Sequence, residues 1–199
     1  MQRWYTMLLP RSARSLGWLA TGIASALAGL NLIGWMLGVA ALKGILPHAT
    51  PMKVITALCL ALSSSALACL LSQSLVGWKR RLPWIAGIAV SSVGLLSLAA
   101  YLIEAATNPP FPWGLLPAAN LFLAPDTRMA VITAILFFIF GIVLLLLGTG
   151  TRRAANAAHL ALLPVTLMSY MVIVGYLLNV HTFYAWTNVG VALNTGIAF

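Results

Sequence analysis

The sequence has very little charge, and almost none of it is acidic. Only two of its 199 residues are acidic, Glu104 and Asp126, against eleven lysines and arginines. Charged residues make up 7% of the chain and hydrophobic residues 62%. Because an ordinary soluble domain carries about 25% charged residues, this composition excludes that class of protein.

Catalytic and metal-binding motifs are missing as well. The chain has no pair of acids, nucleophile triad or phosphate-binding glycine loop, so we expect it not to be an enzyme and to use no cofactor. Its histidines, His48, His159 and His181, have no carboxylate or cysteine at ligand spacing, which predicts no metal site. Cys59 and Cys69 lie about 15 Å apart on one predicted helix, too far for a disulfide.

What the chain does contain is a series of apolar runs. They cover about residues 15–42, 52–76, 82–103, 129–147, 156–178 and 188–199. Runs of about 20 residues match the roughly 30 Å hydrocarbon core of a bilayer. The sequence therefore predicts a single all-α integral membrane domain over residues 1–199, with six transmembrane helices. Its basic residues cluster at helix ends, which indicates a lipid partner and no nucleic acid.

The basic residues predict the orientation. Eight fall at one side of the predicted bundle: Arg3, Arg11, Arg14, Lys79, Arg80, Arg81, Arg152 and Arg153. Three fall at the other side: Lys43, Lys53 and Arg128. Because cytoplasmic loops are enriched in Lys and Arg, both termini are expected in the cytoplasm, with the chain in the inner membrane of a bacterium.

A short phrase recurs at the start of three runs. Residues 52–58 (MKVITAL) return as residues 129–135 (MAVITAI) and, more loosely, as residues 191–197 (VALNTGI). Upstream of each copy comes a small residue followed by an aromatic, as GWMLG at 34–38, AYLIE at 100–104 and GYLLN at 175–179. We interpret the chain as three repeated helical hairpins, at about 15–78, 82–150 and 155–199.

The third hairpin is predicted to be truncated. The last run has twelve residues, about 18 Å of helix, whereas its two counterparts continue for about twenty. We therefore expect this sequence to be a fragment of a longer protein.

Small residues also recur along the first run. Gly17, Thr21, Ser25 and Gly29 follow one another at every fourth position. Small side chains allow a neighbouring helix to approach closely in a membrane, so we expect packing seams along this stripe.

These motifs resemble a known membrane module. The chain resembles the N-terminal multi-pass sensor module of bacterial sensor histidine kinases and diguanylate cyclases. The resemblance lies in the order of its motifs: G-W, a short proline loop, M-K-x-x-T-A-L and then R-M-A-x-x-T-A. These signalling proteins often carry PAS domains. In that module the motif commonly reads M-x-x-N-T-A-L. Thr56, Thr133 and Thr195 match its threonine and Asn194 its asparagine, whereas Ile55 and Ile132 depart from it. The resemblance implies a role in signal transduction, with an output domain outside this sequence.

The repeated threonines and aromatics each allow two interpretations. A threonine hydroxyl at a helix entry can bond a carbonyl one turn back, or the three hydroxyls can converge into a polar ring that binds a small ligand. The aromatics Trp35, Tyr101 and Tyr176 can anchor the helices at the membrane interface or line a pocket.

One acid and one long loop complete the candidate site. Glu104 is an ionisable group at a membrane boundary, and its expected partners are Lys43, Lys53 or Arg128. It opens a loop over 104–128 with five prolines, which we expect to lie on the outer mouth of the bundle. The hypothetical ligand-binding residues are Trp35, Thr56, Tyr101, Glu104, Trp113, Thr133, Tyr176, Asn194 and Thr195.

The leading hypothesis is a sensory input module. It would act as a homodimer, or with partner membrane helices, and couple a small apolar ligand or the bilayer state to a cytoplasmic output. The alternative is a structural or accessory subunit of a larger membrane complex, respiratory or photosynthetic. A transporter ranks last, because the spans carry almost no charge at mid-membrane.

Overall fold

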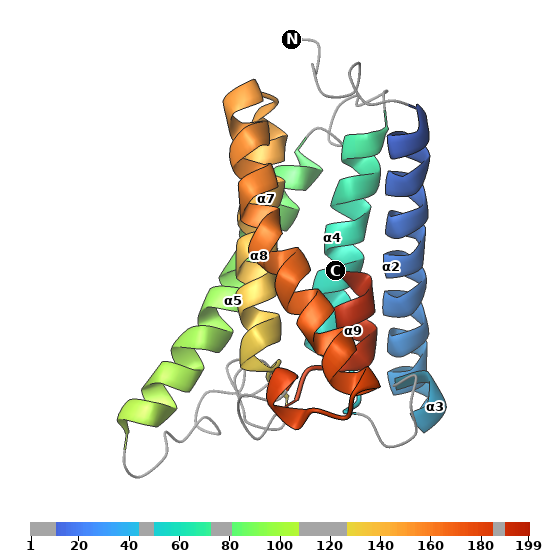
Figure 1. Cartoon of the computed structure of the whole chain (residues 1–199), viewed down its shortest axis with the longest axis vertical. Helices are drawn as coiled ribbons and strands as arrows, with labels where there is room; N and C mark the ends of the chain where they lie inside the picture. The colour runs from blue at the N-terminus through green and yellow to red at the C-terminus, as the bar shows by residue number, and fades with distance from the viewer. Residues whose placement is uncertain (1–10, 44–49, 73–80, 108–126, 185–189) are drawn as a thin grey trace.

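A computed structural model describes residues 11–43, 50–72, 81–107, 127–184 and 190–199, which form helices and connections without a strand. The helices are α2 (Arg11–Leu37), α3 (Ala40–Lys43), α4 (Val54–Leu71), α5 (Leu82–Ala106), α7 (Val131–Thr149), α8 (Arg152–Leu177) and α9 (Leu193–Ala198), with a 3₁₀ turn, η3 (His181–Phe183). The long helices run up and down one bundle (Figure 1).

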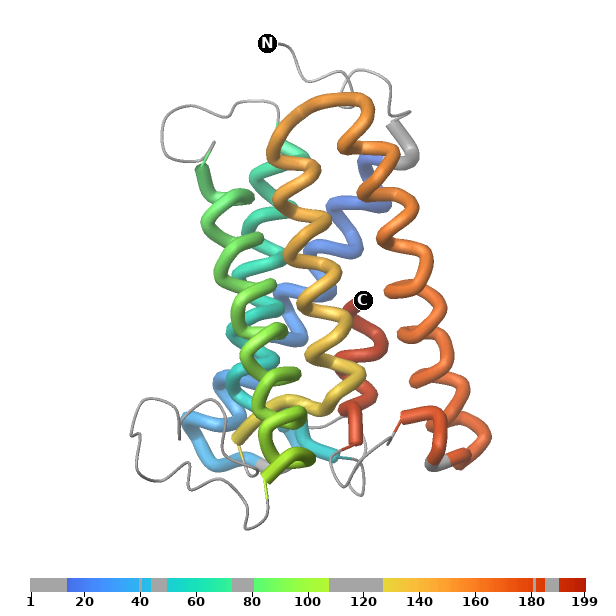
Figure 2. Tube along the Cα trace, turned by 90° about the vertical axis from the view of Figure 1, so that its left-hand side faces the viewer, coloured from blue at the N-terminus to red at the C-terminus, as the bar shows by residue number. Residues whose placement is uncertain are grey.

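Five helices in this part of the chain are long and apolar enough to cross a membrane: α2, α4, α5, α7 and α8. The protein is thus all-helical and has the composition of a multi-pass membrane protein. The sixth predicted run contributes only α9, whose six residues extend about 9 Å. Phe199, at the C-terminal end of the chain, lies about halfway along the bundle (Figures 1 and 2).

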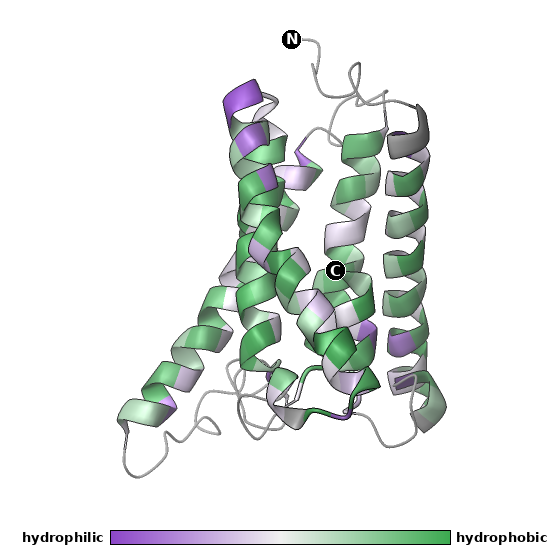
Figure 3. Cartoon of the chain, in the orientation of Figure 1, coloured by the Kyte–Doolittle hydropathy of each residue, from purple (hydrophilic) through white to green (hydrophobic). Residues whose placement is uncertain are grey.

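The bundle has two chemically distinct ends. Helices α2, α5 and α8 begin at the end that carries Arg14, Arg81, Arg152 and Arg153, which we call the arginine end (Figure 1). Helices α4, α7 and α9 begin at the opposite end, which carries the three motif copies with Lys43, Lys53, Glu104 and Arg128, and which we call the motif end. The helices between the two ends are predominantly hydrophobic in colour (Figure 3).

Helix α2 begins and ends earlier than predicted. It ends at Leu37 because Gly38 takes a left-handed conformation, with φ of +71°. The Val39 N–H then donates to the Gly34 carbonyl at 3.0 Å, and the short helix α3 follows. A Cβ on Gly34 would come within 2.6 Å of the Leu42 Cβ. Gly34 therefore accommodates the return of the chain toward α3.

The buried face of α2 also differs from the predicted stripe. Thr21, Ala24, Ala28 and Asn31 are buried, whereas Ser25 is exposed. A four-residue repeat moves around a helix by about 40° per step, because four residues exceed one 3.6-residue turn. The buried residues of α2 are instead spaced alternately by three and four positions. This spacing stays on one side of a helix, and so these residues form its packed face.

The closest helix contact lies between α5 and α7. A Cβ on Gly94 would come within 2.7 Å of the Ala134 carbonyl oxygen, and one on Gly141 within 2.5 Å of the Ser91 backbone nitrogen. Likewise, a Cβ on Gly87 would come within 2.8 Å of the Gly141 carbonyl oxygen. Only glycine fits at these positions, because the opposing atoms belong to backbone and cannot rotate away. This seam was not predicted.

Candidate functional site

The three motif copies begin their helices in the same way. Lys53, Ala130 and Ala192 are the N-cap residues of α4, α7 and α9, with ψ of 150°, 152° and 141°. None of the three caps its helix with a side-chain hydrogen bond. Each motif threonine consequently stands at the third helical position, inside the first turn.

The upstream aromatic of each hairpin binds the motif that follows it. Each donates a hydrogen bond to the carbonyl of the first motif residue: Trp35 Nε1 to Met52 (2.9 Å), Tyr101 Oη to Met129 (3.0 Å) and Tyr176 Oη to Val191 (2.7 Å). We call Trp35, Tyr101 and Tyr176 the aromatic clamps. The sequence predicted that they would either anchor the helices at the membrane interface or line a pocket. In the structure they contact the backbone just before each helix entry.

Two of the clamps lie under a cation. The Lys43 ammonium lies 4.2 Å from the centre of the Trp35 ring, and the Arg128 guanidinium lies 3.8 Å from that of Tyr101. In the third copy, Tyr176 stacks on Tyr184 at 4.2 Å with an interplanar angle of 15°. Cation–π contacts contribute about 0.5–2 kcal/mol, with the larger values where water is excluded. Each of the three aromatic rings is therefore held by a contact on one of its faces.

Glu104 forms an ion pair with Arg128, one of its three expected partners. The Arg128 side chain is 7% exposed and that of Glu104 is 20% exposed. The Nε and Nη1 atoms of Arg128 are buried without a hydrogen-bond partner in the structured part of the chain. Glu104 therefore balances a buried cation, a role that requires no ligand.

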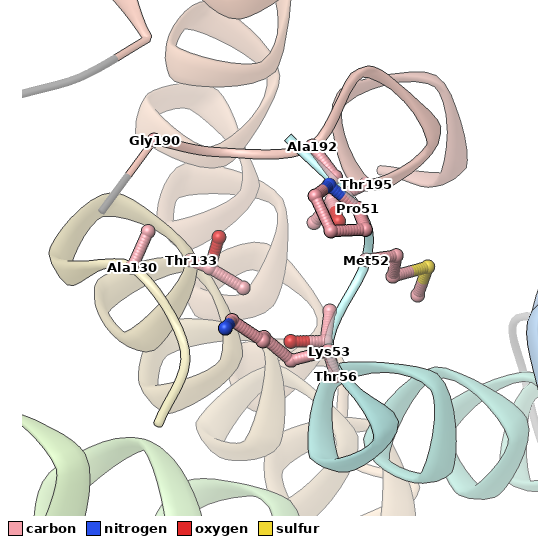
Figure 4. Close-up of a pocket in the computed structure, with 9 residues that line it drawn as sticks. All are labelled: Pro51, Met52, Lys53, Thr56, Ala130, Thr133, Gly190, Ala192 and Thr195. Atoms are coloured by element: carbon pink, nitrogen blue, oxygen red, sulfur yellow. The ribbon is translucent and has the colours of Figure 1, made fainter. Parts of the chain in front are cut away.

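The three motif threonines meet at one small cavity, the threonine cavity (Figure 4). Its lining consists of Pro51, Met52, Lys53, Thr56, Ala130, Thr133, Gly190, Ala192 and Thr195. The Lys53 side chain extends from the α4 entry into the space between the segments (Figure 4). The cavity volume is about 10 Å³, which corresponds to about one water-sized sphere.

The hydroxyl groups at this cavity do not bond back to their own helices. Thr21, Ser91 and Thr166 each donate to the carbonyl four residues earlier, at 2.8, 2.8 and 3.0 Å. Thr56, Thr133 and Thr195 are only 2–3% exposed, and all three line the threonine cavity. The three hydroxyls thus meet at one cavity, and the binding of a ligand there stays a prediction.

The remaining predicted residues are divided between two regions. Trp35, Tyr101, Glu104 and Tyr176 gather at the motif end but line no part of the threonine cavity. Asn194 is buried in α9 beside Thr195. Trp113 lies outside the described residues.

Sequence reasoning missed Lys53 and Gly190 as lining residues. Lys53 was counted as an outer charge, although it is the second residue of the first motif copy and directly precedes α4. That position puts its side chain at the helix entry, and it could have been recognised from the motif alignment. No sequence pattern marks Gly190 as a lining residue. It reaches the cavity only because the third motif copy packs beside the other two in the folded chain.

No protein family, curated protein or solved structure matches this chain. Its function is therefore inferred from the geometry of the motif end.

Loss of an aromatic clamp is expected to destabilise the protein. Tyr176→Phe keeps the stacked ring but removes the donor to the Val191 carbonyl, which costs about 1 kcal/mol of unfolding free energy. Thermal unfolding of the detergent-solubilised chain measures the change. The matched control is Tyr170→Phe, since Tyr170 lies on the same helix and is 64% exposed. Equal unfolding temperatures for the two variants would show that the clamp contributes nothing.

Proposed function

We propose that this chain is a sensory input module that couples the state of its motif end to the position of α9. One observation carries the proposal: the threonine cavity is built from α4, α7 and α9 together, since Thr195 belongs to α9. Anything that enters or leaves the cavity therefore contacts α9 directly. The aromatic clamp from Tyr176 holds the entry of the same helix.

In this proposal the protein lies in a bacterial inner membrane as three repeated hairpins. The arginine end faces the cytoplasm, by the charge asymmetry of the sequence, and the motif end faces outward. The three like clamps and the three like helix entries support one repeated unit. The third hairpin would then place its second helix, α9, as the element directed toward the cytoplasm.

The end of α9 packs against α7 and α8. Phe199, the C-cap residue of α9, has its ring centre 4.9 Å from that of Phe137 and 5.6 Å from that of Phe140. Gly196 faces Val172 on α8. A ligand shifts such a helix only by binding one arrangement better than the other, and a hundredfold preference supplies about 2.7 kcal/mol.

Cysteine cross-linking tests the coupling. A Cβ on Gly196 would lie 3.3 Å from the Val172 Cβ, close to the 3.5–4.5 Å found in disulfides. We expect Val172→Cys with Gly196→Cys, in a Cys59→Ala and Cys69→Ala background, to form a disulfide in native membranes. Adding Thr133→Leu, which fills the cavity from α7, is expected to change the oxidation rate severalfold, as measured by free-thiol counting in a mass spectrometer.

The control for this experiment is Thr166→Leu, an exposed site on α8 that is outside the cavity. Its oxidation rate is expected to equal that of the parent. If Thr133→Leu also leaves the rate unchanged, the cavity does not communicate with α9 and the proposed coupling is wrong.

The outward face of α2 favours a second candidate, a partner-bound subunit. A Cβ on Gly22 or on Gly29 would meet no atom within 4 Å, and Ser25 between them is exposed. This small-residue face has the spacing at which membrane helices associate, either in a homodimer or with other subunits. Blue-native electrophoresis separates these outcomes: comigration with a large complex favours the accessory subunit, and a dimer-sized band favours the sensory module.

A further inference from the structure

We infer that one corner of the arginine end binds the phosphate headgroup of an anionic phospholipid. This headgroup corner consists of the start of α5, with Arg81 and Trp84, and the start of α8, with Arg152 and Arg153. All four residues are exposed. The inference goes beyond the proposed function, because lipid binding at this corner does not depend on α9.

A contact between α5 and the end of α7 assembles the headgroup corner. A Cβ on Gly148 would come within 2.9 Å of the Trp84 indole nitrogen, so the Trp84 ring lies against the last turn of α7. Gly150 then reverses the chain with φ of +71°, and α8 begins at Arg152. Arg81 is the N-cap residue of α5 and precedes Trp84 by less than one helical turn. Both helix starts therefore bring arginines to the same contact.

The arginines of the headgroup corner have no acidic side chain near them. The chain has only two acids, Glu104 and Asp126. Glu104 pairs with Arg128, and it lies near the other end of α5, about 35 Å along the helix from Arg81. Asp126 is two residues from Arg128 in the sequence, so it belongs to the motif end as well. The countercharge for this corner therefore comes from an anion outside the chain.

An apolar row beside the arginines indicates that this anion is part of a lipid. Trp84, Ile88 and Leu95 are 43%, 56% and 53% exposed, and their spacing places them on one face of α5. The row extends about 17 Å, close to the roughly 15 Å depth of one bilayer leaflet. An acyl chain can lie along this row while its phosphate contacts the arginines. Trp84 joins the two parts, because its ring is apolar and its indole N–H is a donor.

The three guanidinium groups favour an anionic headgroup over a zwitterionic one. A guanidinium presents its donors as a planar fork that matches phosphate oxygens in pairs. A zwitterionic headgroup also has a phosphate, but it brings a cation of its own that the arginines repel. Phosphatidylglycerol has the phosphate without that cation, so we expect it to bind more tightly than phosphatidylcholine.

Native mass spectrometry of the full chain tests this preference. The chain is released from micelles with equal amounts of phosphatidylglycerol and phosphatidylcholine, whose acyl chains are identical so that only the headgroups differ. We expect phosphatidylglycerol to bind at least about tenfold more tightly. Arg81→Gln should lower that preference about fivefold, the effect of one arginine at a membrane surface. Equal binding of the two lipids to the unsubstituted chain would overturn the site.

Arg14→Gln is the matched control, since it removes one positive charge from the same end of the bundle. Arg14 belongs to α2, which lies across the bundle from α7 and α8, and its guanidinium donates to the Leu71 carbonyl at 3.1 Å (Figure 1). This variant should keep the lipid preference of the unsubstituted chain. An equal loss in Arg14→Gln and Arg81→Gln would mean that total charge alone attracts the lipid and that the headgroup corner is not a site.

Competition with glycerol 3-phosphate separates a lipid from a soluble phosphate. This molecule has the phosphate but no acyl chain, so the apolar row on α5 contributes nothing to its binding. We expect it to bind at least about tenfold more weakly than phosphatidylglycerol, because each buried methylene adds to the affinity of the lipid. Displacement of phosphatidylglycerol by an equal concentration of glycerol 3-phosphate would assign the corner to a soluble phosphate and overturn the lipid site.

Discussion

Gly141→Ala is expected to destabilise the protein by about 3 kcal/mol, although alanine is the better helix former. The added Cβ would lie 2.5 Å from the Ser91 backbone nitrogen and 2.7 Å from the Gly87 carbonyl oxygen. Neither atom can move without shifting α5, so the two helices must separate along their closest contact. Unfolding of the purified chain by increasing denaturing detergent measures the loss.

A glycine on α2 provides the matched control for that experiment. Gly22→Ala introduces the same methyl group into a helix where no atom lies within 4 Å. Because alanine favours a helix by about 1 kcal/mol over glycine, Gly22→Ala should be neutral or slightly stabilising. If both variants unfold at the same detergent concentration, the glycine seam between α5 and α7 is not a determinant of stability.

Glu104→Gln is expected to cost about 3 kcal/mol, near the low end for a broken buried pair, because the Glu104 side chain is 20% exposed. The substitution keeps the shape of the side chain but takes the Glu104 countercharge away from the buried guanidinium of Arg128. Arg128 also stacks on the Tyr101 ring, so its displacement would disturb the second aromatic clamp. Equilibrium unfolding in detergent again provides the measurement.

The double variant Glu104→Gln with Arg128→Met isolates the cause of that cost. With the buried cation gone, much of the lost stability should return, because an apolar residue can replace a buried pair at little cost. A double variant as unstable as the sum of both single variants would instead mean that the two charges act independently and that the ion pair is unimportant.

The motif end combines two kinds of contact with different consequences. The aromatic clamps and the Glu104–Arg128 pair act on the backbone and on each other, so they set where each helix begins. The threonine cavity lies between the helix entries and brings three hydroxyls together. Substitutions at the clamps are therefore expected to change stability first, and substitutions at the cavity to change the packing of α9 first.

Much of this fold could be predicted from composition and local pattern. The apolar runs predicted the five long helices to within a few residues, because a helix that spans hydrocarbon needs continuous apolar sequence. The largest differences are at the C-termini of α2 and α4, which end five residues before the predicted positions; in α2, Gly38 turns the chain after Leu37. A left-handed glycine gives no composition signal inside a run of small and apolar residues.

By itself, the sequence determined the helical class, the approximate spans, the two charged ends and the threonines, aromatics and helix entries that recur with each motif. All of these depend on residues that are close together in the chain. Only the tertiary structure decided which face of α2 is buried, that Gly94 and Gly141 join α5 to α7, and that Thr56, Thr133 and Thr195 share one cavity. Those features depend on how distant helices rotate and approach one another, and among uniformly apolar side chains no local pattern specifies that rotation.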